Sequence, residues 1–417
     1  MRLTSQILCL LGVTACGSDS PSQGVDPPGS GTASTIDVVE LETPAGTRSG
    51  QPRLARHADG RVLLSWLETT EAVSTLYHST FDGEEWSPKL PVAGGDDWFV
   101  NWADTPSVQP IDHDFWVAHW LQKTPGGPYA YDVALSLSTD GGQTFGEGMV
   151  AHRDGTSSEH GFVSVFSDAG RAGVVWLDGR ETAGGAHGHA DSKVPAGAMT
   201  LRAAALRADG TLEDEQLIDE RVCDCCPTDV AMTSLGPVAV YRDRTTDEVR
   251  DIYASRLVDG AWQAGRPVAR DGWNVAGCPV NGPAIAASGT RVAVAWYTAP
   301  GDAPRVLLAT SKDCGQHFGQ PQLVAGDTAI GRVDVAVLKG GEVVVSWIDA
   351  SGADGAELCI RVLDAQGQLG PRIALADMGA ARAAGVPAIE ITGRSLVFAW
   401  TDVTGETAQV QTARFGL

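Results

Sequence analysis

The chain has 417 residues, of which 52 are acidic and 30 are basic, so its formal net charge is −22. A surface of this charge repels phosphate backbones, and no run of Lys or Arg offsets it, so we expect no nucleic-acid partner. The same acidity favours solubility outside the cell.

The first fifteen residues have the character of a secretion signal. Arg2 supplies a positive charge, and residues 7–13 form an apolar stretch that is too short to span a bilayer. The stretch ends in Val13-Thr14-Ala15-Cys16, which resembles the lipobox of bacterial lipoproteins. That resemblance implies lipid attachment at Cys16 and, because Gly17 follows, an outer-membrane location. An ordinary signal peptide that leaves a free cysteine is the alternative.

Residues 16–35 are rich in Ser, Gly, Pro and Asp, and they are predicted to form the lipidated, disordered tether. Residues 36–417 remain for a single domain, which is large for one hydrophobic core. A repeat architecture resolves this difficulty, because each unit packs only on its neighbours. We expect a monomer that meets the membrane through its lipid alone.

A short β-rich run ending in an aromatic residue recurs along the chain. The aromatic residues are 54, 56, 65, 55, 51 and 53 residues apart, and they are Trp66, Trp120, Trp176, Tyr241, Trp296, Trp347 and Trp400. Periods of this size are typical of propeller blades, and sustained helical periodicity is absent from the sequence. The sequence therefore predicts an all-β fold, a β-propeller of about seven four-stranded blades, with six blades as the alternative.

The strands of one unit are predicted at residues 283–287, 291–296, 306–311 and 321–324. The last unit has only three strands, the third at residues 408–415. Residues 35–41 have no other partner. We therefore expect this N-terminal segment to complete the last blade and close the ring, which removes exposed sheet edges.

Two turns, residues 138–145 and 311–318, fit the pattern Ser-x-Asp-x-Gly-x-x-aromatic. Their Asp is suited to accept hydrogen bonds from turn amides, and their Gly to adopt positive φ. The pattern resembles the Asp-box (BNR) repeat of the sialidase-like propellers. The resemblance implies a propeller fold, with six blades in sialidases, and a glycan or other polar ligand.

The sialidase catalytic set is not evident in the chain. Residues 49–54 match the family's Arg-Ile-Pro segment without its Arg, for which Arg48 is the nearest substitute, and no Tyr follows Tyr297. Whether the protein is an enzyme stays open. If it is one, glycoside hydrolysis is the expected reaction.

In a propeller, the first strand of each blade begins at the face where the second strand ends. This rule collects polar residues around one mouth of the channel. Paired carboxylates there suit glycosidic acid/base chemistry, and the candidates are Glu159, Asp178, Tyr241, Asp243 and Asp251. Predicted ligand-binding residues are Arg48, Asn101, Trp102, Asp104, His160, Arg180, Arg242, Arg250, Asn281 and Arg332. A ring of structural salt bridges is the alternative.

Cys223, Cys225 and Cys226 precede the fourth unit, and Cys278 takes the matching place before the fifth. Adjacent blades bring these positions together, so the four sulfurs are expected to meet. Outside the cytoplasm, disulfides such as Cys278 to Cys225 or Cys226 are the first expectation. A thiolate site for Cu(I) or Zn(II), with His160 as a further ligand, is the second. Unpaired thiols are the third.

Three functions follow from these features. The first is a surface-anchored propeller that binds or processes a glycan or other polar ligand. The second is an extracytoplasmic metal-binding (Cu or Zn) or redox protein that uses the cysteine cluster. The third is a scaffold for protein partners.

Overall fold

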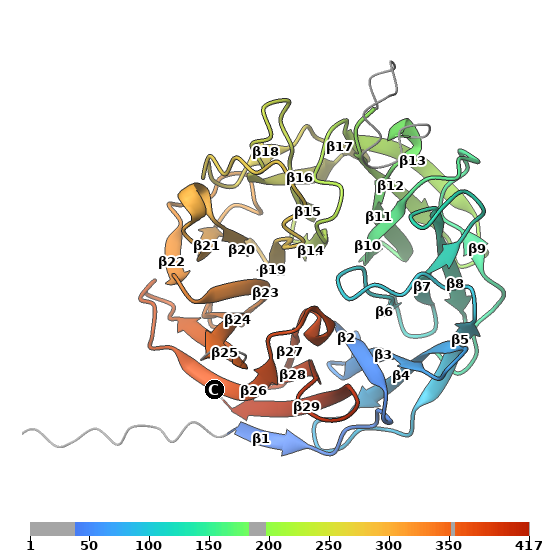
Figure 1. Cartoon of the computed structure of the whole chain (residues 1–417), viewed down its shortest axis with the longest axis horizontal. Coiled ribbons are helices and arrows are strands. Elements are labelled where there is room, and N and C mark those ends of the chain that lie inside the picture. The colour runs from blue at the N-terminus through green and yellow to red at the C-terminus, as the bar shows by residue number, and fades with distance from the viewer. Residues whose placement is uncertain (1–37, 183–196, 352–354, 417) are drawn as a thin grey trace, which may run out of the picture. The chain divides into compact units, whose positions relative to one another are not determined.

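Seven antiparallel sheets are arranged radially around a central axis (Figure 1). The computed structural model describes residues 38–182, 197–351 and 355–416, so the predicted signal peptide, Cys16 and the tether lie outside the described residues. The sequence expectation of a seven-bladed propeller is confirmed, and the six-bladed alternative is wrong. In the described part of the chain no helix has the length and apolar character needed to cross a membrane.

The first three blades follow one another along the chain, each as a four-stranded meander. Their strands are β2 to β5 (Ser49–Arg56, Val62–Thr69, Ser74–Phe81, Leu90–Gly95), β6 to β9 (Ser107–Pro110, Trp116–Lys123, Tyr131–Ser138, Met149–Val150) and β10 to β13 (His160–Asp168, Arg171–Asp178, Thr200–Leu206, Leu212–Asp219). A single helical turn, η1 (Arg180–Thr182), follows β11.

The fourth blade differs at its outer edge, where β17 (Ala261–Trp262) and β18 (Arg266–Pro267) both pair with the third strand. Its other strands are β14 to β16 (Asp229–Thr233, Gly236–Arg242, Ile252–Val258). Blades five and six contain β19 to β22 (Ala284–Ser288, Arg291–Thr298, Arg305–Ser311, Gln322–Ala325) and β23 to β26 (Ala329–Val337, Val343–Ser351, Gly355–Leu363, Ile373–Gly379). The turns η2 (Pro300–Asp302) and η3 (Arg382–Ala384) lie between strands.

The last blade closes the ring with a strand from the other end of the chain. It contains β27 (Ala388–Thr392), β28 (Ser395–Asp402) and β29 (Gln409–Gly416), and β1 (Val38–Leu41) pairs antiparallel with β29. The predicted closure by the N-terminal segment is therefore confirmed. Figure 1 shows β1 and β29 side by side at the perimeter.

The recurring aromatic residues all lie in the second strand of their blade and form the core between blades. Trp66, Trp176, Tyr241 and Trp296 are fully buried, while Trp120 and Trp400 retain 7% exposure. Burying an aromatic side chain of this size removes the largest apolar area that any residue offers, which explains why the repeat is anchored by it.

Buried carboxyl groups join neighbouring blades near the channel. Asp104 accepts a hydrogen bond from the Phe162 amide of the next blade at 2.8 Å. The Asp229 and Asp334 carboxyls accept equivalent bonds, also of 2.8 Å, from the amides of Ile285 and Ile389. Burial raises the pKa of Asp104 to about 8 and that of Asp334 to about 7. These groups therefore hold the ring together and are not free for chemistry.

The two Ser-x-Asp turns have the same hydrogen bonds. Asp140 accepts from the Thr144 amide at 2.9 Å, and Asp313 accepts from the His317 amide at 3.0 Å. In the first turn Gly142 has a φ of +80°, and a Cβ atom there would lie 2.5 Å from the Trp116 ring. Only glycine fits this position.

Candidate functional site

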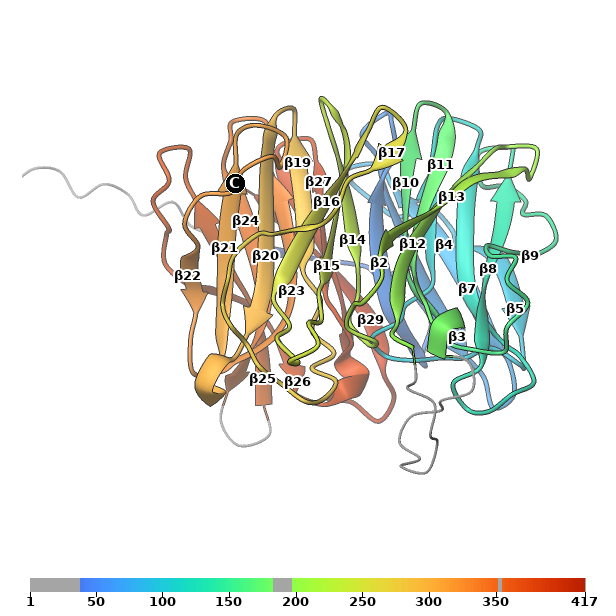
Figure 2. The ribbon, with the colours of Figure 1, turned by 90° about the horizontal axis from the view of Figure 1, so that it is seen from above.

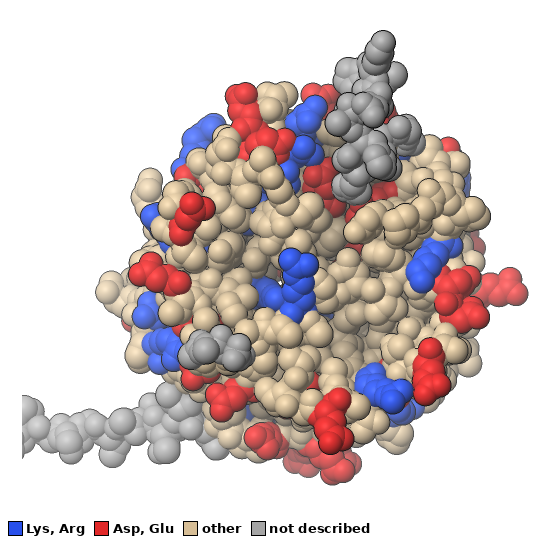
Figure 3. Space-filling model, in the orientation of Figure 1, with Lys and Arg blue, Asp and Glu red and all other residues tan. Residues whose placement is uncertain are grey.

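The strands of every blade run between two faces of the ring, which Figure 2 shows edge-on. β10 begins with His160, and this residue pairs with Asp178 at the end of β11. We call the face where first strands begin and second strands end the rim face. Figure 3 looks onto this face and shows basic side chains at its centre, with most acidic ones toward the perimeter.

Three of the four predicted cysteines form a tight sulfur cluster on the rim face. The Sγ atom of Cys223 lies 2.7 Å from that of Cys226 and 4.0 Å from that of Cys225. The sulfur atoms of all three lie within 4.8 Å of one another. Cys278, from the loop before the fifth blade, lies near Cys225, and the contact between the two thiols raises the pKa of Cys225 and lowers that of Cys278. The structure thus brings three of the four sulfurs together, with Cys278 beside Cys225 at the edge of the cluster.

The burial of these four residues is graded. Cys223 and Cys226 are buried, Cys225 is half-buried and Cys278 is exposed. All six cysteines in the described residues are free thiols. No two of them lie at disulfide-bond distance, since the shortest sulfur separation, 2.7 Å between Cys223 and Cys226, exceeds a bond length of about 2.05 Å, so the expected disulfides are not shown.

Guanidinium groups surround the sulfur cluster. Arg250 donates a hydrogen bond from Nη1 to the Cys223 sulfur at 3.2 Å. Arg244 donates two hydrogen bonds to Asp224, at 2.9 and 3.1 Å. Burial raises the pKa of Cys223, but hydrogen bonds from the neighbouring thiols and the charge of Arg242 outweigh it, so this pKa lies well below its usual value.

Arg242 ties the two cysteine-bearing loops together. It is 1% exposed, and it donates hydrogen bonds to the carbonyl oxygens of Asn281, Arg250 and Tyr297 at 2.7 to 3.1 Å. The loops also touch directly, because a Cβ atom on Gly282 would lie 2.1 Å from the Pro227 carbonyl oxygen. Cys278 is thus held beside the other three residues by a rigid support.

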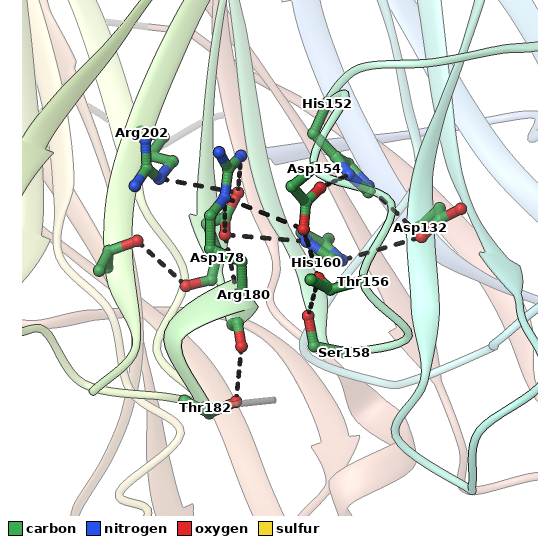
Figure 4. A network of polar contacts seen from close by, with 12 residues as sticks. Asp132, His152, Asp154, Thr156, Ser158, His160, Asp178, Arg180, Thr182 and Arg202 are labelled. Atoms are coloured by element: carbon green, nitrogen blue, oxygen red, sulfur yellow. Dashed lines mark hydrogen bonds and ion pairs between the residues drawn. The ribbon is translucent and has the colours of Figure 1, made fainter. Parts of the chain in front are cut away.

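His160 does not join the cysteines, which corrects the prediction that it is a further ligand there. It belongs to a second polar cluster between blades two and three, drawn in Figure 4. Its ring stacks on His152 with centroids 3.6 Å apart. Three carboxylates surround the two rings, and they come from Asp132, Asp154 and Asp178.

Arginine neutralises one side of this His-Asp cluster. Arg180 forms two hydrogen bonds with Asp178, at 2.7 and 2.8 Å, and Trp176 donates a third to the same carboxylate at 2.7 Å. Arg180 also pairs with Glu215 at 2.8 Å. Asp178 is therefore committed to an internal ion pair.

The remaining predicted catalytic groups are engaged in internal contacts. Tyr241 donates to Asp219 at 2.6 Å, and Glu159 accepts from Tyr131 at 2.7 Å. Asp251 accepts from the Gly272 amide at 2.9 Å. Burial raises the pKa of Asp243 to about 6. This pattern supports the structural alternative for these residues.

Several of the predicted ligand-binding residues also form hydrogen bonds within the protein. Arg332 donates to the carbonyl oxygens of Ala381 and Gly385 at 3.1 and 3.2 Å and lies 4.5 Å from the centre of the Trp102 ring. The Asn101 side chain accepts from the Ala103 amide, and that of Asn281 accepts from the Arg332 amide. Arg48 is exposed beside a groove of about 270 Å³.

A large cavity lies elsewhere. It has a volume of about 1110 Å³ and occupies the central channel, lined by the first strands of all seven blades. Its lining extends to the turns between first and second strands, so it is at the end opposite the rim face. Its wall includes the ionisable side chains of Arg53, Asp229, Asp334 and Glu390, and burial raises the pKa of the three carboxyl groups.

Sequence reasoning predicted a site at the rim-face mouth of the channel, and it missed the cavity at the opposite end and most of the His-Asp cluster. Each blade contributes one short segment to the channel, so no local pattern marks it. His152 and Asp154 follow the two-residue strand β9, in the loop that connects the second blade to the third. The only available signal was the spacing His152-x-Asp154, which is common in loops.

Comparisons with known proteins place the chain by fold alone. No protein-family model matches it, and no curated protein does. Similar solved structures include the polysaccharide lyase Uly1, with 7% identity over 91% of this chain and 98% of that one and a TM-score of 0.52. The phage phi92 endosialidase is 9% identical over 92% of this chain and 69% of its own chain, with a TM-score of 0.51.

A protein of unknown function from Dyadobacter fermentans DSM 18053 has 13% identity over 91% and 97% of the two chains, with a TM-score of 0.50. The sialidase-like propeller fold expected from the sequence is thus shared with an endosialidase. At these identities the likeness does not extend to activity.

Proposed function

We propose that this protein binds a soft metal ion, Cu(I) or Zn(II), through the sulfur atoms of Cys223, Cys225, Cys226 and Cys278. The observation that carries the proposal is the convergence of three sulfur atoms within 4.8 Å of one another, with Cys278 close enough to Cys225 for each thiol to shift the pKa of the other. Thiolates are the ligands that select these ions.

The support around the cluster suits a preformed binding site. Arg242 and the contact between Gly282 and Pro227 hold the two loops together without a metal. Arg250 places a positive charge beside Cys223, which offsets part of the negative charge of thiolates packed together. Binding therefore requires little reorganisation of the fold.

Coordination number distinguishes the two ions. Zn(II) in structural sites takes four ligands, and it needs the exposed Cys278 as well as the three clustered cysteines. Cu(I) is satisfied by fewer thiolates, which the buried part of the cluster supplies. Loss of Cys278 is therefore expected to lower the affinity for Zn(II) more than the affinity for Cu(I).

Metal titration of the reduced, metal-free protein tests the proposal. Cu(I) and Zn(II) are each added in competition with a chromophoric chelator, and Co(II) serves as a probe whose sulfur-to-metal charge-transfer band reports thiolate ligation. We expect one sulfur-bound ion per chain, lost in Cys223→Ser. Cys359→Ser is the matched control, because Cys359 is a buried free thiol in another blade. Unchanged binding in Cys223→Ser would refute the site.

Export and anchoring are a further part of this proposal. The N-terminal sequence supports lipid attachment at Cys16 and an outer-membrane location. Metabolic labelling with a radioactive fatty acid tests it, since Cys16→Ser abolishes labelling of a lipoprotein. Label retained in that variant would rule out the lipobox.

Glycan binding is the second candidate, and the channel cavity is the observation that favours it. A volume of about 1110 Å³ lined by charged and polar groups accommodates an oligosaccharide. Solved structures of similar fold include a polysaccharide lyase and an endosialidase. A glycan array tests this candidate. Binding that is weakened by Arg53→Ala supports the channel, whereas an array with no bound glycan removes it.

A further inference from the structure

The His-Asp cluster contains two imidazole nitrogens that no hydrogen bond satisfies. They are Nε2 of His152 and Nε2 of His160, on side chains that are 3% and 0% exposed. Buried polar atoms are nearly always hydrogen-bonded, so two unpartnered ones in contact with carboxylates require an explanation.

The orientation of His152 is fixed by Asp154. Nδ1 of His152 lies 2.6 Å from Asp154 Oδ1 and therefore carries the proton of that hydrogen bond. Nε2 is left with a lone pair, which faces Asp132 Oδ1 at 3.4 Å. A lone pair and a carboxylate oxygen repel each other unless a positive charge lies between them.

The other ring completes the same arrangement. His160 turns Nε2 toward Asp154 Oδ2 at 3.3 Å and Nδ1 toward Asp132 Oδ1 at 3.8 Å. The Asp154 carboxylate thus faces Nδ1 of His152 and Nε2 of His160. The Asp132 carboxylate faces the other nitrogen of each ring, Nε2 of His152 and Nδ1 of His160 (Figure 4). An outer carboxylate that orients two imidazoles is the usual support of metal-binding histidines.

We propose that Asp132, His152 and His160 bind a borderline divalent cation of the Zn(II) class, with Asp154 as the positioning residue for both rings. One oxygen of Asp132, Nε2 of His152 and Nδ1 of His160 lie within 4.8 Å of one another. For Nδ1 to bind the ion, His160 gives up its 3.3 Å contact with the Tyr131 carbonyl and holds its proton on Nε2, toward Asp154. Its ring also turns out of the parallel stack on His152, because a bound ion lies in the plane of each imidazole that binds it.

Charge balance is consistent with a divalent ion. Three carboxylates surround the rings, and the guanidinium of Arg180 offsets one of them, while Arg202 and Glu215 add one charge of each sign. Two negative charges remain to be balanced. Protonation of both histidines would supply two positive charges, but it would place two positively charged rings 3.6 Å apart. A single divalent metal ion supplies the same two charges without this repulsion.

The ligand set leaves a coordination position open. Two imidazoles and one carboxylate are three protein ligands, the number found in zinc sites that keep a position for water or substrate. The Asp132 side chain is 21% exposed, so this position is reachable from solvent. The site differs from the cysteine cluster in donor type, because it contains nitrogen and oxygen only.

The test separates this site from the sulfur site by removing the latter. In a Cys223→Ser, Cys226→Ser background, Co(II) and Zn(II) are titrated into the protein. We expect one bound ion whose Co(II) spectrum has d–d bands and no sulfur charge-transfer band. Asp154→Asn is expected to lower the affinity roughly 10- to 100-fold, and His152→Gln and Asp132→Asn more strongly. His78→Gln, a buried histidine outside the cluster, is the control.

Failure of the two proposals is distinguishable. One ion bound without a sulfur band in the Cys223→Ser, Cys226→Ser background supports this site even if the sulfur site fails, whereas absence of any bound ion in that background overturns it. If the His152 or Asp132 variants do not fold, nitrogen-15 NMR of the histidine rings replaces them. Addition of Zn(II) then shifts the ring signals of His152 and His160 selectively, and unchanged signals refute the site.

Discussion

The guanidinium of Arg250 donates a hydrogen bond to the sulfur of Cys223 across 3.2 Å, although both side chains are almost fully buried. A buried cation in contact with a thiol favours its ionised form. The pair therefore links an arginine of the β15–β16 loop to the reactivity of the cysteine cluster.

Replacing Arg250 tests that link. In Arg250→Gln the pKa of Cys223 is expected to rise, because the charge that favours the thiolate is gone while burial continues to disfavour it. The ultraviolet thiolate absorbance of the metal-free protein, followed against pH, measures the change. Arg305→Gln, at an exposed position on β21, serves as the control. Identical titration curves for Arg250→Gln and the unmodified protein would contradict the assignment.

Arg242 is expected to be important for stability. Arg242→Met removes charged donors from three backbone carbonyl groups and leaves them poorly satisfied. A loss of roughly 2–4 kcal/mol in the free energy of unfolding is expected, since each unsatisfied group costs about 1–3 kcal/mol and neighbouring effects are not additive. Urea unfolding measures it. A change within about 0.5 kcal/mol would mean that water replaces the donors.

Asp104 predicts a pH dependence of stability. Its pKa is raised to about 8 by burial, so between the unfolded value and pH 8 the folded state holds a proton that the unfolded state has lost. This contribution makes the protein less stable as pH rises through that window. Asp104→Asn keeps the acceptor for Phe162 and cannot ionise.

The two proteins are compared by urea unfolding at about pH 5 and about pH 8. The stability of the variant relative to the unmodified protein is expected to increase at the higher pH. A difference that is the same at both values would show that Asp104 does not titrate within this window.

Gly142 and Gly60 separate steric exclusion from backbone strain. Both have positive φ, but a Cβ atom on Gly142 meets Trp116 at 2.5 Å, whereas one on Gly60 meets nothing within 4 Å. We expect Gly60→Ala to cost about 1 kcal/mol and Gly142→Ala about 2–4 kcal/mol in thermal or urea unfolding. Equal losses in the free energy of unfolding would mean that backbone strain accounts for the whole effect and that the contact with Trp116 adds nothing.

The blade repeat was predictable because its signal is periodic. Residues such as Trp66 and Trp296 fill equivalent positions between blades, so their spacing reports the number of units directly. The approach of Cys278 to Cys225 was also predictable, since adjacent first strands begin side by side. These predictions rest on topology alone and do not need side-chain positions.

The chemistry of individual side chains was not predictable in the same way. No local sequence pattern indicates that the Arg242 guanidinium donates its hydrogen bonds to backbone carbonyl groups, or that the His152 ring stacks on that of His160. The partners in these contacts come from different blades. The rule that collects residues at one face does not show whether they are free or paired. Asp178 and Tyr241 were candidates for catalysis for this reason, yet each is held by an internal partner.

Pairing of β1 with β29 also has a consequence for biosynthesis. During translation β1 leaves the ribosome before any blade exists, and its partner β29 is the last of the described strands to be made. Until then the final blade has an open edge, and contacts between the two ends of a chain are the slowest to form. The newly made protein therefore depends on protection from aggregation for the whole period of its synthesis.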